Sequence, residues 1–215
     1  MNQNIRTLPT VVIISVTAVI GLVFIFTLYT KQGNANEATG KELNELTYGT
    51  IQLYSNDEHE KLNKLAKTEG SKTEKARIIF SDYIPATRAK ELIISYKLTN
   101  VREIHIGWGS HKAGYTLKQN ESLDDGIISA TKAHEKFLNI AIAGSHPRLL
   151  SEFQKEKEQF DKTGMTIFGF DADGEIKQLK KIKDENQNIW LIDVDETNKG
   201  HFIIPISPND LKSLK

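Results

Sequence analysis

Twenty consecutive uncharged residues near the N-terminus constrain this chain more than any other feature of its sequence. They run from Val11 to Thr30 and are mostly aliphatic or aromatic. At about 1.5 Å per helical residue, the run measures about 30 Å, which is the thickness of the hydrocarbon core of a bilayer. Tyr29 and Lys31, at one end, are residue types that favour the headgroup layer. We therefore predict a transmembrane helix over residues 11–30 that contacts membrane lipid.

The length of this apolar run favours an uncleaved anchor over a cleaved signal peptide. A signal peptide has an apolar stretch of about 7–15 residues followed by small residues at the cut, and the sequence offers only Gly33-Asn34-Ala35 there. Residues 1–10 are too few to fold, so most of the chain lies on one side of the membrane. We expect a single-pass protein of the cell membrane with a short cytoplasmic head at 1–10 and its C-terminal domain outside the cytoplasm.

The rest of the chain has the composition of a globular domain. The 215 residues are 39% hydrophobic and 26% charged, with 28 basic and 28 acidic side chains. Because this balance gives no field that attracts nucleic acid, we expect no nucleic-acid partner. The lack of cysteine excludes disulfides, thiolate metal ligands and a cysteine nucleophile. Residues 31–47 are polar, which is typical of a tether, and this leaves residues 48–215 for the folded domain.

The first part of the folded domain alternates between strand and helix patterns. The Ser55–Glu58 segment has the S-x-x-E spacing of a capping box, which predicts the start of a helix. Ile104 and Ile106 alternate with Glu103 and His105, which predicts a strand. In chain order we expect a strand at 48–54, a helix at 55–67, a strand at 76–83, a helix at 86–97, a strand at 101–108, a loop at 109–119, a helix at 122–138, a strand at 139–143 and a helix at 147–161.

Hairpin turns follow Gly164. Four strand-like runs, at 165–171, 175–182, 188–196 and 201–207, are separated by turn residues such as Asp-Gly and Asn-x-Gly. A helix over Glu175–Lys183 is the alternative for the second run. The whole pattern predicts an α+β fold in which a transmembrane helix precedes a mixed sheet with helices packed on it and a C-terminal antiparallel meander.

Two segments carry the same Gly-Ser-His triplet after an expected strand. The second triplet also precedes a helix, whose free N–H groups, with a serine and a histidine beside them, would suit a small anion. Plain helix capping is the alternative. Neither serine lies in the G-x-S-x-G context of a hydrolase. The candidate residues for a small anion or other ligand are Ser110, His111, Ser145 and His146.

Two further groups of residues raise the question of a metal site. His105 and His111 would form a metal or acid–base site if an acid joined them, but dispersed histidines are the commoner outcome. Carboxylates on neighbouring hairpins would bind calcium if they converged, and acidic hairpin ends are the alternative. These carboxylates are Asp171, Asp173, Asp193 and Asp195. Because no ligand spacing is complete, we expect no catalytic, cofactor-binding or metal-binding residues and no cofactor.

The order of elements from 76 to about 173 resembles a known family. The segments that carry the resemblance are ARIIFSDY, ATRAKELIISYK, VREIHIGWG, NIAIAGS and PRLLSEF, with Trp108, the Gly144-Ser145 turn and Leu149-Leu150 as markers. They resemble the extracytoplasmic C-terminal domain of sigma-factor regulator proteins of Firmicutes. The resemblance implies a regulatory, non-enzymatic module that follows a single membrane span and responds to the state of the envelope. Residues 1–10 are too few to hold a sigma factor, so we expect no direct anti-sigma activity.

Together these features predict a membrane-anchored extracytoplasmic domain that regulates or binds an unknown protein partner and has no enzymatic activity. A structural component of a cell-envelope or secretion assembly is the first alternative. An anchored hydrolase, which would use Ser110, His111 and His146 with nearby acids, is the second alternative.

Overall fold

The computed structural model describes residues 48–108, 111–145, 147–194 and 206–213. They belong to one compact unit, Lys41–Lys215. The predicted head at 1–10, span at 11–30 and tether at 31–47 lie outside the described residues. Within the described part, no helix combines the length and the apolar character needed to cross a bilayer.

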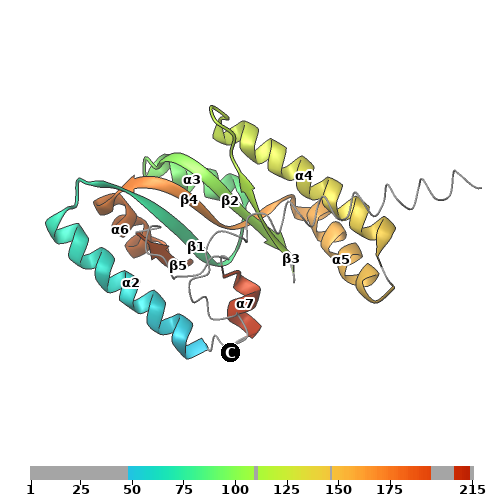
Figure 1. The fold of residues 1–215 in the computed structure, drawn as a ribbon, viewed down its shortest axis with the longest axis horizontal. Coiled ribbons are helices and arrows are strands. Elements are labelled where there is room, and N and C mark those ends of the chain that lie inside the picture. Colours follow the sequence, from blue (N-terminus) through green and yellow to red (C-terminus); the bar gives the residue numbers. More distant parts are fainter. Residues whose placement is uncertain (1–47, 109–110, 146, 195–205, 214–215) are drawn as a thin grey trace, which may run out of the picture. The chain divides into compact units, whose positions relative to one another are not determined.

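A five-stranded sheet with the order β3-β2-β4-β1-β5 forms the centre of the domain (Figure 1). Every neighbouring pair is antiparallel, so the predicted α+β class is confirmed while the predicted mixed sheet is wrong. The strands are β1 Thr73–Pro85, β2 Thr99–Trp108, β3 His111–Thr116, β4 Thr166–Glu175 and β5 Ile189–Asp193.

Two strand–helix–strand units interlock in this sheet. Helix α3 (Ala86–Ser95) connects β1 to β2 across β4, and helix α6 (Ile176–Glu185) connects β4 to β5 across β1. The strands that a helix connects run parallel, but each such pair is separated by an antiparallel strand, and this explains the absence of parallel neighbours. The arrangement is the ferredoxin-like βαββαβ topology. Strand β3 and the helices α4 (Leu123–Gly144) and α5 (Pro147–Thr163) form an insertion between its second and third strands.

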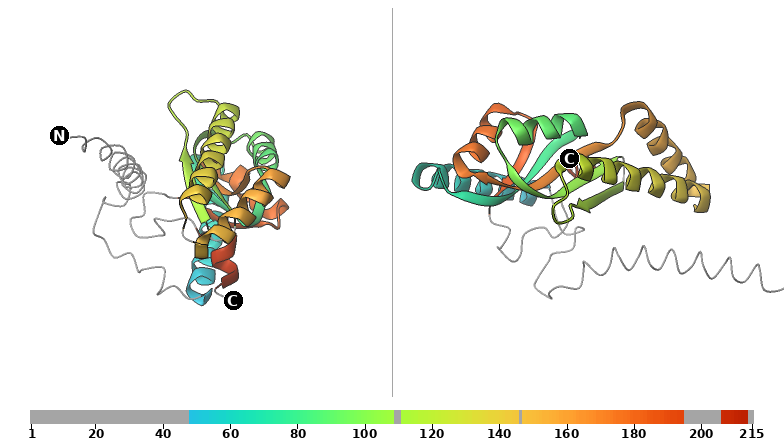
Figure 2. Two further views of the ribbon diagram at one scale, coloured as in Figure 1. Left: turned by 90° about the vertical axis from the view of Figure 1, so that its right-hand side faces the viewer. Right: turned by 90° about the horizontal axis from the view of Figure 1, so that it is seen from above.

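The main core lies between the sheet and the helices α3 and α6, which cover the same face (Figure 2, right). Alternate residues of each strand point into this core, as the pleat of a strand requires. Full burial of a large aliphatic or aromatic side chain stabilises the fold by roughly 1.5–3 kcal/mol. The buried residues include Ile78 and Phe80 of β1, Ile104 and Ile106 of β2, Phe170 and Ala172 of β4, Ala89 and Leu92 of α3, and Ile176 and Leu179 of α6.

Helix α2 (Tyr48–Thr68) replaces the predicted strand at 48–54 and helix at 55–67 with one continuous helix. Ile51, Ser55 and Leu62 are all buried at helical spacing, whereas Leu53, which the strand interpretation places on the same face as Ile51, is 63% exposed. Ile51 packs with Trp190 and with residues beside the short C-terminal helix α7 (Pro208–Ser213). Tertiary contacts therefore extend the helix beyond its capping-box sequence.

Helices α4 and α5 include both confirmed and corrected predictions. Ser122 caps α4 as expected, because its hydroxyl accepts a hydrogen bond from the Asp125 N–H at 3.1 Å. The apolar run at 139–143 is the last part of α4 rather than a strand, and the predicted loop at 109–119 contains β3. Helix α5 is confirmed, and its Leu149 is 47% exposed.

The predicted C-terminal meander is wrong because its second strand is helix α6. Ile176, Leu179 and Ile182 are buried along one side of α6, so the alternative helix is confirmed. Three-residue spacing of apolar side chains over ten residues was enough to form this helix against the sheet. Most of the last predicted strand, residues 201–205, lies outside the described residues.

Candidate functional site

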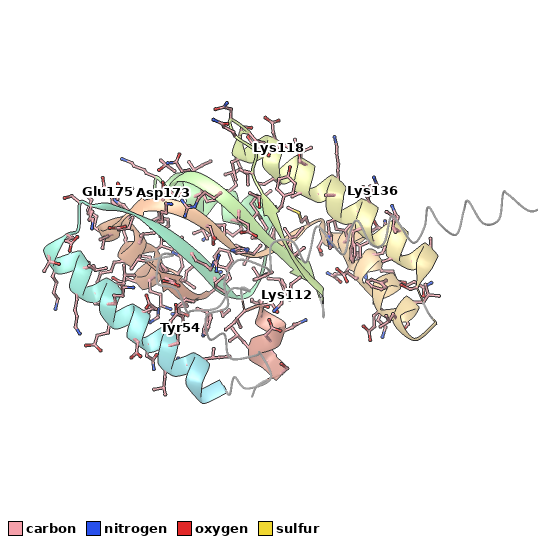
Figure 3. The ribbon with its side chains drawn as sticks, in the orientation of Figure 1. Tyr54, Lys112, Lys118, Lys136, Asp173 and Glu175 are labelled. Atoms are coloured by element: carbon pink, nitrogen blue, oxygen red, sulfur yellow. The ribbon has the colours of Figure 1, made fainter. Side chains whose placement is uncertain are left out.

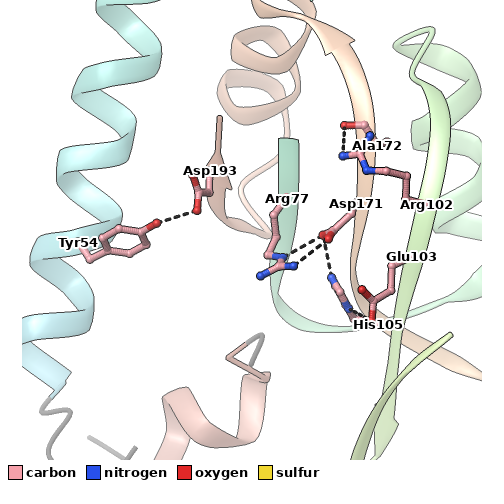
Figure 4. A network of polar contacts seen from close by, with 8 residues as sticks. All are labelled: Tyr54, Arg77, Arg102, Glu103, His105, Asp171, Ala172 and Asp193. Carbon is pink, nitrogen blue, oxygen red and sulfur yellow. Dashed lines mark hydrogen bonds and ion pairs between the residues drawn. The ribbon is translucent and has the colours of Figure 1, made fainter. Parts of the chain in front are cut away.

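A row of four charged residues crosses the sheet on the face opposite α3 and α6. Glu103 of β2 pairs in register with Asp171 of β4, Asp171 pairs with Arg77 of β1, and Arg77 pairs with Asp193 of β5. Their neighbours along each strand point into the main core, so by alternation these four share the other face. His105 lies on this face too, two residues after Glu103 (Figure 4).

Asp171 is the centre of the network. Arg77 donates two hydrogen bonds to its carboxylate, from Nε at 2.9 Å and from Nη2 at 2.8 Å, and His105 Nε2 lies 2.9 Å from Oδ1. Burial alone raises the pKa of Asp171, but the hydrogen bonds from His105 and Arg77 outweigh burial and bring this pKa well below its usual range. Asp171 is therefore an ionised carboxylate held by a bidentate guanidinium and an imidazole.

The imidazole of His105 is fixed by two residues of β4. Its ring stacks on Phe168, with 5.7 Å between ring centroids. A Cβ atom at Gly169 would lie 3.0 Å from Cδ2 of His105 and 2.6 Å from the carbonyl oxygen of Ile78. Only glycine at position 169 leaves this space for the ring. The sequence Phe168-Gly169-Phe170-Asp171 thus supplies the stacking surface, the space and the hydrogen-bond acceptor for one histidine.

The second ring nitrogen of His105, Nδ1, has a different setting from Nε2. Because an ionised Asp171 accepts but does not donate, Nε2 carries the hydrogen of that contact, and a neutral ring then has its lone pair on Nδ1. Nδ1 is buried without a partner among the described residues. The Glu103 Oε1 atom lies 3.8 Å away, which is beyond hydrogen-bond distance. A proton on Nδ1 would therefore place a donor opposite a carboxylate.

Glu103 occupies space over the edge strand β3. Its side chain is 31% exposed. Its Oε1 atom lies 1.8 Å from the position that a Cβ atom at Gly114 would take, and Gly114 is the register partner of His105. The Glu103 carboxylate is therefore partly exposed to solvent, lies over Gly114, and is close to Nδ1 of His105.

The aspartates that the sequence suggested as calcium ligands do not converge within the described residues. Asp171 binds Arg77 and His105, Asp173 accepts from Asn100 at 2.8 Å and pairs with Arg102, and Asp193 accepts from the Tyr54 hydroxyl at 2.7 Å. Burial, and then Asp193, raise the pKa of Tyr54. Asp195 lies outside the described residues. Across the described ranges, no group of three or more histidine or acidic side chains is arranged to hold a metal ion.

The four predicted ligand residues fall in different settings. Ser110 and His146 lie outside the described residues, His111 begins β3, and Ser145 ends α4 at the turn before α5. Only the first Gly-Ser-His triplet follows a strand, because residues 140–144 are helical. The two triplets therefore follow different kinds of element, and the small-anion site stays a prediction.

Sequence reasoning placed His105 and Glu103 on one face of a strand but missed Arg77 and Asp171 as their partners. Gly169 and Asp171 alternate along β4 and so lie on one face of the sheet. This spacing indicates a place for a neighbouring side chain, but only the strand order shows that the neighbour is His105. No family model, curated protein or solved structure matches this chain.

Proposed function

We propose that this protein is a membrane-anchored, non-enzymatic regulatory domain outside the cytoplasm, and that it senses the state of the envelope by binding a proton at His105. The observation that carries the proposal is the buried Nδ1 atom of His105, which has no hydrogen-bond partner within the part of the chain that the structure describes and faces Glu103 at 3.8 Å. The predicted span at 11–30 and the resemblance to sigma-factor regulator domains support the location and the regulatory role.

Charge balance favours proton uptake at this position. The groups that face the ring are Asp171 of β4, Glu103 of β2, and Arg77 of β1, which reaches it through Asp171, together with the Phe168 ring. With a neutral ring the two carboxylates and one guanidinium carry a net charge of −1, and protonation of His105 cancels it. An unsatisfied buried polar atom costs about 1–3 kcal/mol, and a proton on Nδ1 removes this cost by making the atom a donor to Glu103.

Proton uptake would change the surface of the β2–β3 strand pair. A protonated His105 attracts the Glu103 carboxylate, which then leaves its position above Gly114 on the edge strand. A partner protein that contacts this strand pair would bind the two protonation states with different affinity, and such a difference is what a population shift requires. A change in envelope pH would in this way alter partner binding.

Nitrogen NMR of the histidine rings in the detergent-solubilised full-length chain tests the proposal. At high pH we expect the spectrum of His105 to show the Nε2–H tautomer with a bare Nδ1, and at low pH we expect a proton on Nδ1. Glu103→Gln should lower the fraction of His105 rings that are protonated at a fixed low pH, because an amide stabilises the imidazolium less than a carboxylate does. Glu74→Gln is the matched control, because the Glu74 side chain is 32% exposed and Glu103 is 31% exposed.

Two outcomes of these NMR experiments would contradict the proposal. A His105 ring that has the same protonation state in both spectra would refute proton sensing. A protonated fraction that Glu103→Gln leaves unchanged, or that Glu74→Gln lowers as much, would show that Glu103 is not the group that receives the proton's hydrogen bond.

A further inference from the structure

Helices α4 and α5 form a hairpin whose distal part, the end of α4 and the start of α5, extends beyond the strands of the sheet (Figures 1 and 2). The proximal part of this helical hairpin belongs to the fold, since Ala130 is in the main core and Ile127 and Phe160 pack against it. The distal part differs, because Ile140 is 46% exposed and Leu149 is 47% exposed. None of the residues 139–145 is buried.

The distal surface combines apolar side chains with positive charge. Residues 137–151 contain no acidic residue. Lys132 and Lys136 line a shallow depression together with Ile140 and Ala143, and Glu135 is also part of this lining. Within the described ranges, neither lysine forms an ion pair with another residue. We call this surface the hairpin tip. It comprises the residues of α4 that line the depression and Leu149 near the start of α5. Lys136 lies on the outer side of α4 (Figure 3).

We propose that the hairpin tip docks on the surface of an anionic bilayer. Ile140 and Leu149 would enter the headgroup layer, while Lys132 and Lys136 would pair with lipid phosphates. Apolar side chains bordered by basic ones are the chemistry of interfacial helices, and anionic lipid attracts such clusters. A lipid surface suits this site better than a folded protein, because the basic side chains match anionic lipid phosphates and the end of the helix pair extends beyond the strands (Figures 1 and 2).

The proposed anchor brings a bilayer within reach of the tip, and the inference rests on that anchor. Residues 31–47, fully extended, reach about 60 Å from the end of the span. A domain on such a tether meets the bilayer surface at a high effective concentration, so a small docking surface is sufficient. Docking would then limit the orientations that the domain adopts above the membrane.

Single-cysteine labelling tests the docking directly, because the chain has no cysteine of its own. Ile140→Cys, labelled with an environment-sensitive fluorophore, is compared with Ile94→Cys on α3, where the native side chain is 62% exposed. The full-length chain is added to vesicles of phosphatidylcholine alone or with phosphatidylglycerol. In anionic vesicles we expect a blue shift and quenching by spin-labelled lipid at position 140, whereas position 94 stays open to aqueous iodide. Lys132→Gln with Lys136→Gln should reduce lipid quenching at position 140 at least twofold.

Three results would overturn the docking proposal. The first is a label at position 140 that iodide quenches equally in neutral and anionic vesicles. The second is a blue shift that appears in detergent together with cross-linked dimers, which would show that a second copy covers the tip. The third is lipid quenching that the two lysine substitutions leave unchanged.

Alkaline extraction of the same vesicles separates docking from anchorage. A chain that extraction releases would refute the proposed anchor, and the label still reports whether its tip touches lipid. A chain that stays in the vesicles with a water-exposed tip would refute docking alone.

Discussion

The network around Asp171 and the hairpin tip distribute polarity in opposite ways. In the network, Asp171 and His105 are almost completely buried in the sheet, where Arg77 and His105 satisfy the Asp171 carboxylate and Glu103 lies near the Nδ1 atom of His105. At the tip, Ile140 and Leu149 are about half exposed. A buried charge is tolerated only where partners satisfy it, whereas partly exposed apolar side chains need no such partner. The comparison indicates that the network holds the domain together, while the tip is free to serve a contact outside it.

Asp171→Asn is expected to have the largest effect on stability. It removes the negative partner of Arg77 and His105, and breaking a buried ion pair costs about 3–5 kcal/mol. Urea unfolding of the detergent-solubilised full-length chain measures this loss. Asp161→Asn in the hairpin is the control, because it breaks a more exposed pair with Lys157 at 2.6 Å, and such pairs contribute only about 0–1 kcal/mol. Equal losses would remove the contrast between the two regions.

Asp171→Asn should also change how the free energy of unfolding depends on pH. The pKa of Asp171 is depressed in the folded chain, so its contribution is complete above the unfolded value of about 4. It is lost as the pH falls from there toward the depressed folded value. The wild-type chain should therefore lose stability below about pH 4 more steeply than Asp171→Asn does, as measured by unfolding at a series of pH values.

Glycine-to-alanine substitutions compare packing in the two regions. Gly169→Ala would put a Cβ atom 2.6 Å from the Ile78 carbonyl oxygen, and we expect a loss of about 1–3 kcal/mol, as for other overpacked sites. Gly144→Ala, at the end of α4, meets nothing within 4 Å. There we expect a gain of up to about 1 kcal/mol, because alanine restricts the unfolded chain. Thermal unfolding measures both, and a destabilising Gly144→Ala would mean that the tip is more tightly packed than its exposure indicates.

Polar substitutions at the hairpin tip should leave stability almost unchanged. Ile140→Ser and Leu149→Ser each replace a side chain that is about half exposed, and we expect changes within about 0.5 kcal/mol. Phe153→Ala, which truncates a buried side chain of α5, is the destabilising control at about 3–5 kcal/mol. If the serine variants unfold as readily as Phe153→Ala, the tip belongs to the core of the fold.

His59 differs from His105 in its surroundings, and NMR can detect the difference. Burial, and then the positive charge of Lys183, lower the pKa of His59 to about 4. Its stabilising contribution, which comes from the neutral ring, is therefore present above the ordinary value of about 6.5 and is lost as the pH falls toward 4. Nitrogen NMR should find His59 neutral at pH 5, because burial and the charge of Lys183 outweigh the opposing charge of Asp184. A His59 that is charged at pH 5 would contradict this reading of its surroundings.

Local sequence patterns predicted β1, α3 and β2 because their alternation or helical spacing matches the faces they bury. The predicted strands at 48–54 and 139–143 are wrong because short apolar runs fit a strand or a helix equally well. Contacts from Ile51 to Trp190 and the continuation of α4 decide in favour of helix. The network was out of reach for a similar reason, since Arg77 and Asp171 are 94 positions apart and meet only through the strand order.

That strand order also affects how the chain assembles as it emerges. The strand between β1 and β2 is β4, which ends at Glu175, after the whole α4–α5 insertion. Until that late segment arrives, β1 and β2 have no partner between them, and long-range pairing of this kind slows folding. A chain that emerges with its N-terminal residues first would therefore expose these unpaired strand edges until β4 appears. During that interval the chain would be a substrate for chaperones and proteases.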